Sequence, residues 1–191
     1  ERYGFGSRVR EFNRIAAEHA RSQAGDGQFV AGSVGPTGLF MEPLGPLTES
    51  EMYDGFAEQI SALAEGGADT VVIETMISPE EAEVAIRAAS ENTELVIVGT
   101  MTFDRGPRGL FTMWGNTPTE AVQRLGDAGA DIVGTNCGNG IKVMIEIALE
   151  MRKATDKFLI VHSNAGIPSI VERKAKYPET PEFMVPGFKE L

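Results

Sequence analysis

The residues best suited to chemistry are one cysteine and one glutamate that follow short apolar segments. Cys137 lies in the glycine-rich string 134–138, and Glu74 ends the apolar run Val71–Ile73. A thiolate on an open turn is a nucleophile and a metal ligand. A carboxylate beside a buried run is costly unless it is paired, so it suits a substrate ammonium group or a general base. Cys137 is therefore a candidate for contact with a metal or a substrate, and Glu74 is a candidate for binding an ammonium group or acting as a base.

Each of these features also has a purely structural interpretation. A lone cysteine after an apolar strand is commonly a small buried side chain, and Glu74 can accept hydrogen bonds from loop amides. The segment from Ser33 to Gly38 is either a plain tight turn or a phosphate-binding turn, although the lysine of a P-loop is absent. The segment Asp104–Gly109 is either a charged, solvated loop or a lid over the site.

A complete zinc site cannot be assembled from this chain. Zinc takes three or four protein ligands, whereas the sequence holds 1 Cys and 2 His. His162 ends an apolar segment and is a possible neighbour of Cys137, while His19 lies on the opening helix. A nucleophilic pair of His162 and Ser163 is disfavoured, because adjacent residues of a strand point to opposite faces.

Short apolar runs predict the strands that position these residues. Little alternation within the runs is typical of a parallel sheet covered on both faces. Polar residues follow every run, and the carboxyl ends of parallel strands meet at one edge, where sites of α/β proteins form. We expect Ser33, Glu74, Cys137 and Asn164 at that edge. The five predicted strands are Phe29–Ser33, Thr70–Glu74, Leu95–Thr100, Asp131–Thr135 and Phe158–His162.

Capping signals predict the helices between the strands. Thr48, Ser78 and Thr117 are each followed three positions later by Glu, which predicts three reciprocal capping boxes. Glycines are expected to end the helices. The remaining expectations are an opening helix over Arg8–Ser22, a buried face of Met52, Phe56, Ile60 and Leu63, helix ends at Gly66–Gly67 and Gly126, a long loop over Ile167–Pro186, and a truncated helix or loop over Phe183–Leu191.

The spacing of the strands limits the architecture. Successive predicted strands begin on average about 32 residues apart, so eight units of a closed (β/α)8 barrel need about 258 residues. The chain has 191 residues, begins with Glu1 and contains a weak repeat of Gly-Ala-Asp at 67–69 and 129–131. We therefore expect either an open doubly wound sheet or part of a barrel, with sequence missing at both ends.

Composition excludes several classes of function. The 17 Lys and Arg against 28 Asp and Glu give a formal charge of −11, which disfavours a nucleic-acid groove and an anionic membrane surface. No apolar run approaches the roughly 20 residues of a membrane span. One cysteine excludes an internal disulfide and indicates a reducing compartment, so we expect a cytoplasmic protein.

Taken in order, several strings resemble the homocysteine S-methyltransferase family, in particular the homocysteine-binding module of its cobalamin-dependent members. The similarity spans nearly the whole chain. The matching strings are Val30–Gly38, Gly66–Asp69, Ile73–Met76, Gly134–Gly138, His162–Pro168 and Tyr177–Phe183.

The resemblance implies a fold and a site. The fold would be a (β/α)8 TIM-type barrel, with residues 1–191 forming a single partial homocysteine-binding barrel domain that supplies the third to seventh strands. Cys137 matches the first of three zinc cysteines, and the adjacent cysteine pair that completes the family's zinc site is absent. Glu74 matches the acidic residue that holds the amino group of homocysteine. Ser33 and Asn164 lie on matching turns and are assigned to substrate binding.

The resemblance also implies a reaction. This is zinc-dependent transfer of a methyl group to the thiol of homocysteine, which gives methionine, from a methylated corrinoid on a partner protein or module. Two alternatives stay open. One is a corrinoid-linked methyltransferase with another acceptor or donor, and the other is a non-catalytic open α/β binding module in which Cys137 is merely packed.

Overall fold

The computed structural model describes residues 4–191 and is organised around a parallel sheet of five strands. All five predicted strands are confirmed, with ends that differ by at most two residues. They form β1 (Ala31–Val34), β2 (Thr70–Met76), β3 (Val96–Met101), β6 (Ile132–Asn136) and β7 (Phe158–His162). The carboxyl ends of all five strands therefore lie at one edge of the sheet.

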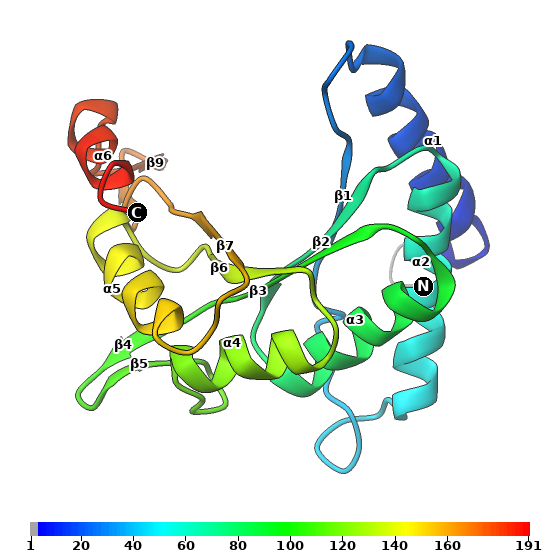
Figure 1. The fold of residues 1–191 in the computed structure, drawn as a ribbon, viewed down its shortest axis with the longest axis horizontal. Coiled ribbons are helices and arrows are strands. Elements are labelled where there is room, and N and C mark those ends of the chain that lie inside the picture. The colour runs from blue at the N-terminus through cyan, green and yellow to red at the C-terminus, as the bar shows by residue number, and fades with distance from the viewer. Residues whose placement is uncertain (1–3) are drawn as a thin grey trace.

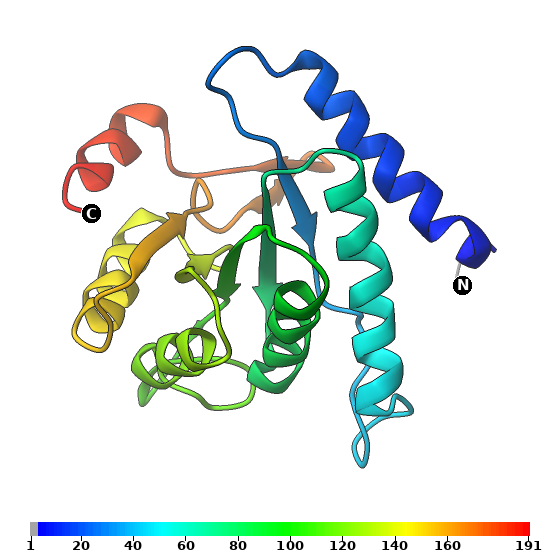
Figure 2. The ribbon, with the colours of Figure 1, turned by 45° about the vertical axis from the view of Figure 1, so that its right-hand side comes forward.

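The order of the strands distinguishes between the two expected architectures. The order is β1-β2-β3-β6-β7, so neighbours in the sheet are successive long strands of the chain. A doubly wound sheet reverses its order at a switch point, and this sheet does not. Figures 1 and 2 show a curved sheet with the helices along its outer side. The arrangement is that of an arc of a TIM-type barrel.

Helices occupy the connections between these strands. A short 3-10 helix (Gly6–Arg8) leads into α1. In chain order, β1 is followed by α2, β2 by α3 and β6 by α5. The bounds are α1 (Val9–Gln23), α2 (Glu49–Glu65), α3 (Pro79–Asn92), α4 (Pro118–Asp127), α5 (Ile141–Arg152) and α6 (Pro181–Phe188). No helix among residues 4–191 is long and apolar enough to cross a lipid bilayer.

The two faces of the sheet differ in how they are covered. Strand residues on the outer face, such as Val71 and Val133, pack with the helices and are fully buried. The predicted face of α2, from Met52 to Leu63, is buried here as well. On the inner face, Phe158 keeps 79% of its surface exposed and Val96 keeps 45%. β1 and β7 are the edge strands of this sheet, so its two edges are unpaired within residues 4–191. The inner face is buried at Val98 and Thr100 and exposed at Val96 and Phe158.

Two of the three predicted capping boxes are confirmed. Thr48 and Thr117 each accept a hydrogen bond from the amide of the residue three positions on, whose carboxylate accepts from the cap amide in return. The prediction is wrong for Ser78. Its hydroxyl accepts from the amide of Glu81, but the Glu81 carboxylate turns away and accepts from the amide and hydroxyl of Thr37, at 2.7 Å each.

The weak sequence repeat is one turn used twice. Gly67 and Gly129 have φ values of 92° and 110°, in the left-handed region that favours glycine. In each copy the aspartate accepts a hydrogen bond from an amide of the neighbouring, earlier strand. The Val30 amide at the start of β1 donates to Asp69 at 2.6 Å, and the Ile97 amide of β3 donates to Asp131 at 2.8 Å. The turn thereby ties the end of a helix to two neighbouring strands.

The predicted end of α4 at Gly126 is wrong. α4 runs through Asp127 and includes Gly126, which was expected to end it. The chain reverses at Gly129 instead, because that residue adopts the positive φ. The end of α2 is as expected, with Gly66 as its cap.

The opening helix is confirmed, but most of its apolar side chains are not buried. Only Ala17 of α1 is buried, whereas Phe12 is 39% exposed. The reason is a close crossing of α1 over Gly66, where an added Cβ would lie 2.6 Å from the Cβ of Ala17.

Two segments expected as loops contain regular structure. Within Ile167–Pro186 the chain forms the hairpin of β8 (Ser169–Val171) and β9 (Lys174–Lys176) and then begins α6. The prediction of a long loop over this segment is therefore wrong. The sequence hid the hairpin because its strands are three residues long and exposed. Asp104–Gly109 belongs to a second hairpin, β4 (Asp104–Gly106) with β5 (Gly109–Phe111). The residues of β4 are exposed, as expected for a charged, solvated segment.

The turn at Asp69 predicts a stability that depends on pH. The amide of Val30, followed by the guanidinium of Arg21, lowers the pKa of the Asp69 carboxyl. A carboxyl with a lowered folded-state pKa stabilises the fold above its unfolded pKa of about 3.9, and the benefit is lost as pH falls through the folded value. Asp69→Asn should therefore lower the melting temperature near neutral pH, with a gap that closes in acid. Thermal melts over a pH series check this. Exposed Asp127→Asn is the control, and a gap that persists in acid would contradict the explanation.

Candidate functional site

The side chain of Asn136 is the centre of a polar network at the carboxyl edge of the sheet. It ends β6 and is 1% exposed. Its Oδ1 accepts hydrogen bonds from the Thr75 amide at 2.8 Å and from the Thr100 hydroxyl at 2.7 Å. Its Nδ2 donates to the Thr75 hydroxyl at 2.8 Å. One buried amide thus joins the ends of β2, β3 and β6.

Glu74 lies in the same network. Its Oε1 accepts a hydrogen bond from the Ser33 hydroxyl at 2.6 Å, and its Oε2 accepts from Nδ2 of Asn136 at 3.3 Å. The carboxylate is half-buried on the inner side of the sheet. Its hydrogen-bond donors come from side chains on two other strands, and not from the loop amides of the structural interpretation. The arrangement orients the carboxylate, which remains partly exposed.

Cys137 follows Asn136 directly and is half-buried. Its Sγ lies 3.3 Å from Nδ2 of Asn136 and 3.8 Å from the Thr75 hydroxyl. The amide of Cys137 donates to the carbonyl of His162 at 3.1 Å, so the turn is anchored on β7. The side-chain amide of Asn136 therefore contacts both the thiol and the carboxylate of Glu74. The structural interpretation required the sulfur to be packed in the apolar core, and it is not packed there.

The backbone is strained at the two turns of the network. Thr75 has φ 63° and Cys137 has φ 59°, both in the left-handed region. This conformation is uncommon for residues other than glycine and is a marked outlier for a β-branched threonine. Strain of this kind costs of order 1–3 kcal/mol and is retained where the surroundings enforce it, commonly at functional sites.

Asn164 lies at the same edge but outside the network. Its amide donates to the carbonyl of Asn139 at 3.1 Å, which attaches the turn after β7 to the turn after β6. Its side chain forms no hydrogen bond with any residue in 4–191. The adjacent Ser163 hydroxyl donates to the carbonyls of Asn164 and Asn139, at 2.8 and 3.5 Å. Ser163 is therefore not paired with the imidazole of His162.

The segment beyond β7 supports this edge from outside. The Glu179 carboxylate accepts from the amide of Ile141 at 3.0 Å and so caps the start of α5. The Glu179 amide donates to the carbonyl of Ala165 at 3.0 Å. Gly140 makes this approach possible, because an added Cβ would lie 1.9 Å from the Glu179 carboxylate.

The described residues do not make a metal site by themselves. Across residues 4–191 no group of three or more His, Cys, Asp and Glu side chains converges in a way that could hold an ion. Cys137 supplies one thiol, and the hydrogen bonds of Glu74 engage it with Ser33 and Asn136. Zinc takes three or four protein ligands, so the residues described here do not complete a zinc site.

Three members of the network carried no assigned role from sequence alone. Asn136, Thr75 and Thr100 stand in the strings that marked the functional edge, but their pairing depends on the register of β2, β3 and β6. The only signal in the sequence was that each polar residue closes an apolar strand. The turn after Ser33 is a plain turn here, because the Glu81 carboxylate already uses the donors of Thr37.

A comparison with family models gives the class of protein to which this chain belongs. The family model described as homocysteine S-methyltransferase matches residues 1–190, and the chain belongs to that family. Among curated relatives, the betaine–homocysteine S-methyltransferase 1 of Danio rerio is 29% identical over 95% of this chain and 42% of its own length. The methionine synthase of Mycobacterium tuberculosis is 25% identical over 94% of this chain and 16% of its own length. The chain therefore spans less than half of either relative.

Solved structures support the same fold. The apo form of the homocysteine methyltransferase MmuM from Escherichia coli superposes with a TM-score of 0.68, covering 84% of this chain and 62% of that one. The metallated form of the same protein superposes with a TM-score of 0.61. The sequence identity is 22% in both cases, so this likeness concerns the fold alone.

Two asparagines at this edge should differ sharply in their contribution to stability. Asn136→Ala removes the acceptor of the Thr75 amide and leaves the buried Thr100 hydroxyl with only the Ile73 carbonyl at 3.5 Å, which should lower the free energy of unfolding by about 2–4 kcal/mol. Asn164→Ala removes no hydrogen bond within residues 4–191 and should change it by no more than about 0.5 kcal/mol. Urea unfolding of both variants checks this. Equal effects would show that the Asn136 network is not a structural centre.

Proposed function

We propose that this chain forms the homocysteine-binding part of an enzyme that methylates the thiol of homocysteine and yields methionine. The observation that carries the proposal is the contact of one Asn136 amide with both Glu74 and Cys137. Family membership supplies the substrate class. The amino acid and the reacting sulfur would then be handled by two side chains of one network.

Glu74 would bind the ammonium group of homocysteine. A carboxylate held by Ser33 and Asn136 is oriented before the ligand arrives, and a charge-assisted hydrogen bond to an ammonium group is stronger than a neutral one. The fixed carboxylate would place the substrate sulfur in one position relative to the methyl donor, which is the contribution of orientation to the rate. Asn164, with a side chain that is free of hydrogen bonds within residues 4–191, would contact the substrate from the turn after β7.

Cys137 would contribute one ligand to a zinc ion. The support is the chemistry of a half-buried thiol at the substrate edge together with membership of the family. The other ligands would lie outside these 191 residues, since the chain has no second cysteine.

The relatives favour two different methyl donors. We propose a methylated corrinoid carried by a partner protein or module, on the basis of the similarity to methionine synthase. The higher identity to betaine–homocysteine S-methyltransferase supports betaine as the second candidate. Donor competition assays separate the two.

We also propose that the arc closes into a (β/α)8 barrel in the active protein. The open edges of β1 and β7 and the exposed Phe158 on the inner face support closure, because unpaired strands and apolar surface favour association. On this proposal the 191-residue chain alone should bind a hydrophobic dye and self-associate in sedimentation experiments. A monodisperse monomer that binds no dye would contradict it.

The role of Glu74 predicts a selective loss of substrate binding. Glu74→Gln retains the shape of the side chain but removes the charge, so homocysteine affinity should fall by about tenfold or more. Calorimetric titration with homocysteine, with and without zinc, measures the change. Glu58→Gln, at an exposed position of α2, is the matched control. Unchanged affinity in Glu74→Gln would rule out the ammonium-binding role.

The role of Cys137 predicts a loss of both metal and activity. Cys137→Ser should reduce bound zinc in the active protein, measured by atomic absorption, and abolish thiol methylation. A Cys137→Ser protein with the full zinc content and normal turnover would eliminate Cys137 as a ligand.

A further inference from the structure

A cavity separate from the network opens beside the start of α3. Its volume is about 290 Å³, and its wall is formed by the loop after β1, the first turns of α2 and α3, and the loop after β5. None of Ser33, Glu74, Asn136 or Cys137 lines it. The apolar part of its wall consists of Leu39, Phe40, Met41, Pro43, Leu44, Met52 and Trp114.

Two aromatic rings form one side of the cavity. Phe40 and Trp114 come from different loops and meet edge to face, with ring centroids 5.6 Å apart and an interplanar angle of 89°. Both rings remain partly exposed, at 44% and 41%. Exposed aromatic side chains that converge on a hollow are typical of a binding site and not of a closed core.

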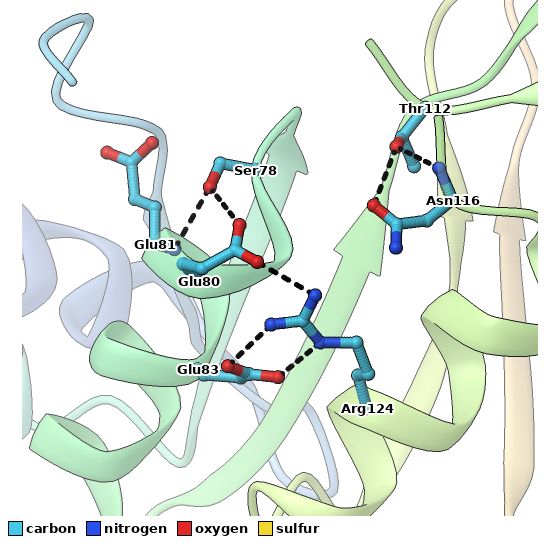
Figure 3. A network of polar contacts seen from close by, with 7 residues as sticks. All are labelled: Ser78, Glu80, Glu81, Glu83, Thr112, Asn116 and Arg124. Atoms are coloured by element: carbon cyan, nitrogen blue, oxygen red, sulfur yellow. Dashed lines mark hydrogen bonds and ion pairs between the residues drawn. The ribbon is translucent and has the colours of Figure 1, made fainter. Parts of the chain in front are cut away.

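The polar part of the wall is acidic. Glu42, Glu80 and Glu81 line the cavity, and none of the lining residues is Lys, Arg or His. The adjacent Arg124 does not line it. Figure 3 shows that guanidinium bound by Glu80 and Glu83, at 2.9 Å and at 2.6 and 2.9 Å. The positive charge of Arg124 is therefore already paired with Glu80 and Glu83.

The Glu81 carboxylate is the group in the cavity wall best placed to bind a cationic ligand. It is 4% exposed, and its Oε1 accepts both hydrogen bonds from Thr37. Its Oε2 has no donor among residues 4–191. In Figure 3 the carboxylate points away from Ser78, Glu80 and Arg124. No fully buried side-chain oxygen among residues 4–191 lacks a partner, so Oε2 keeps contact with solvent at the cavity that Glu81 lines. An ammonium group that replaced this water would form a charge-assisted hydrogen bond with the carboxylate, which is stronger than a neutral one.

We propose that this cavity binds a small organic ammonium ion with an apolar body. The N–H groups of the ammonium would donate to Oε2 of Glu81, and the apolar body would pack against Phe40, Trp114 and Met52. A ligand without N–H groups would leave the oxygen unpaired, so a primary ammonium is favoured over a quaternary one. The inference is independent of the reaction proposed for the network.

The probe for this site is phenethylammonium, and Trp114 is the reporter because it is the only tryptophan of the chain. Titration should give a saturable change in tryptophan fluorescence. Phenethyl alcohol and the N-trimethyl derivative of the probe should bind at least about tenfold more weakly, because neither brings a charged N–H group. Equal affinity for the alcohol, or no saturable change with phenethylammonium, would overturn the proposal.

Variants test the residue assignment. Glu81→Gln should weaken phenethylammonium at least about tenfold, while exposed Glu58→Gln should leave it unchanged. If circular dichroism shows that Glu81→Gln is unfolded, Trp114→Leu decides, since that position is partly exposed and its loss should weaken binding measured by calorimetry. Full affinity in a folded Glu81→Gln protein, or in Trp114→Leu, would overturn the proposal.

Discussion

The buried amide of Asn136 is the interaction on which the proposed site depends. A primary amide offers an acceptor and a donor in fixed geometry, and here both are used across three strands. The acceptor holds the turn after β2 and the hydroxyl of β3. The donor faces Thr75, the Glu74 carboxylate and the Cys137 thiol. An aspartate of the same shape would lose these donor contacts and place a second negative charge beside Glu74. Structure and chemistry are therefore coupled through one side chain.

The network also explains why the chain accepts strain at this edge. Left-handed backbone at Thr75 and Cys137 turns both side chains towards Asn136, which binds the amide of one and contacts the sulfur of the other. The apolar layer between the outer face of the sheet and the helices stabilises the fold and offsets the free-energy cost of this strain. The sheet order adds the second requirement. The parallel order β2-β3-β6 places the ends of these three strands side by side.

Much of this arrangement could be predicted from sequence, because its signals are local. Apolar runs located all five long strands, and the threonine caps located α2 and α4. The misses arose where tertiary contacts outweighed local patterns. Glu81 was assigned to a capping box, but Thr37 from a distant loop binds its carboxylate. The exposed β8–β9 hairpin left no apolar pattern to detect, and the role of Asn136 depended on strand register that no local signal encodes.

The most direct test of the central claim is protection of Cys137 by the proposed product. The chain has a single cysteine, so alkylation by iodoacetamide reports on that sulfur alone, and methionine has no thiol that would consume the reagent. Methionine should slow alkylation of the unmodified chain and should fail to do so in Glu74→Gln, because the carboxylate holds the amino acid next to the sulfur. Alkylation that is indifferent to methionine, or protection that survives in Glu74→Gln, would contradict a shared site for Glu74 and Cys137.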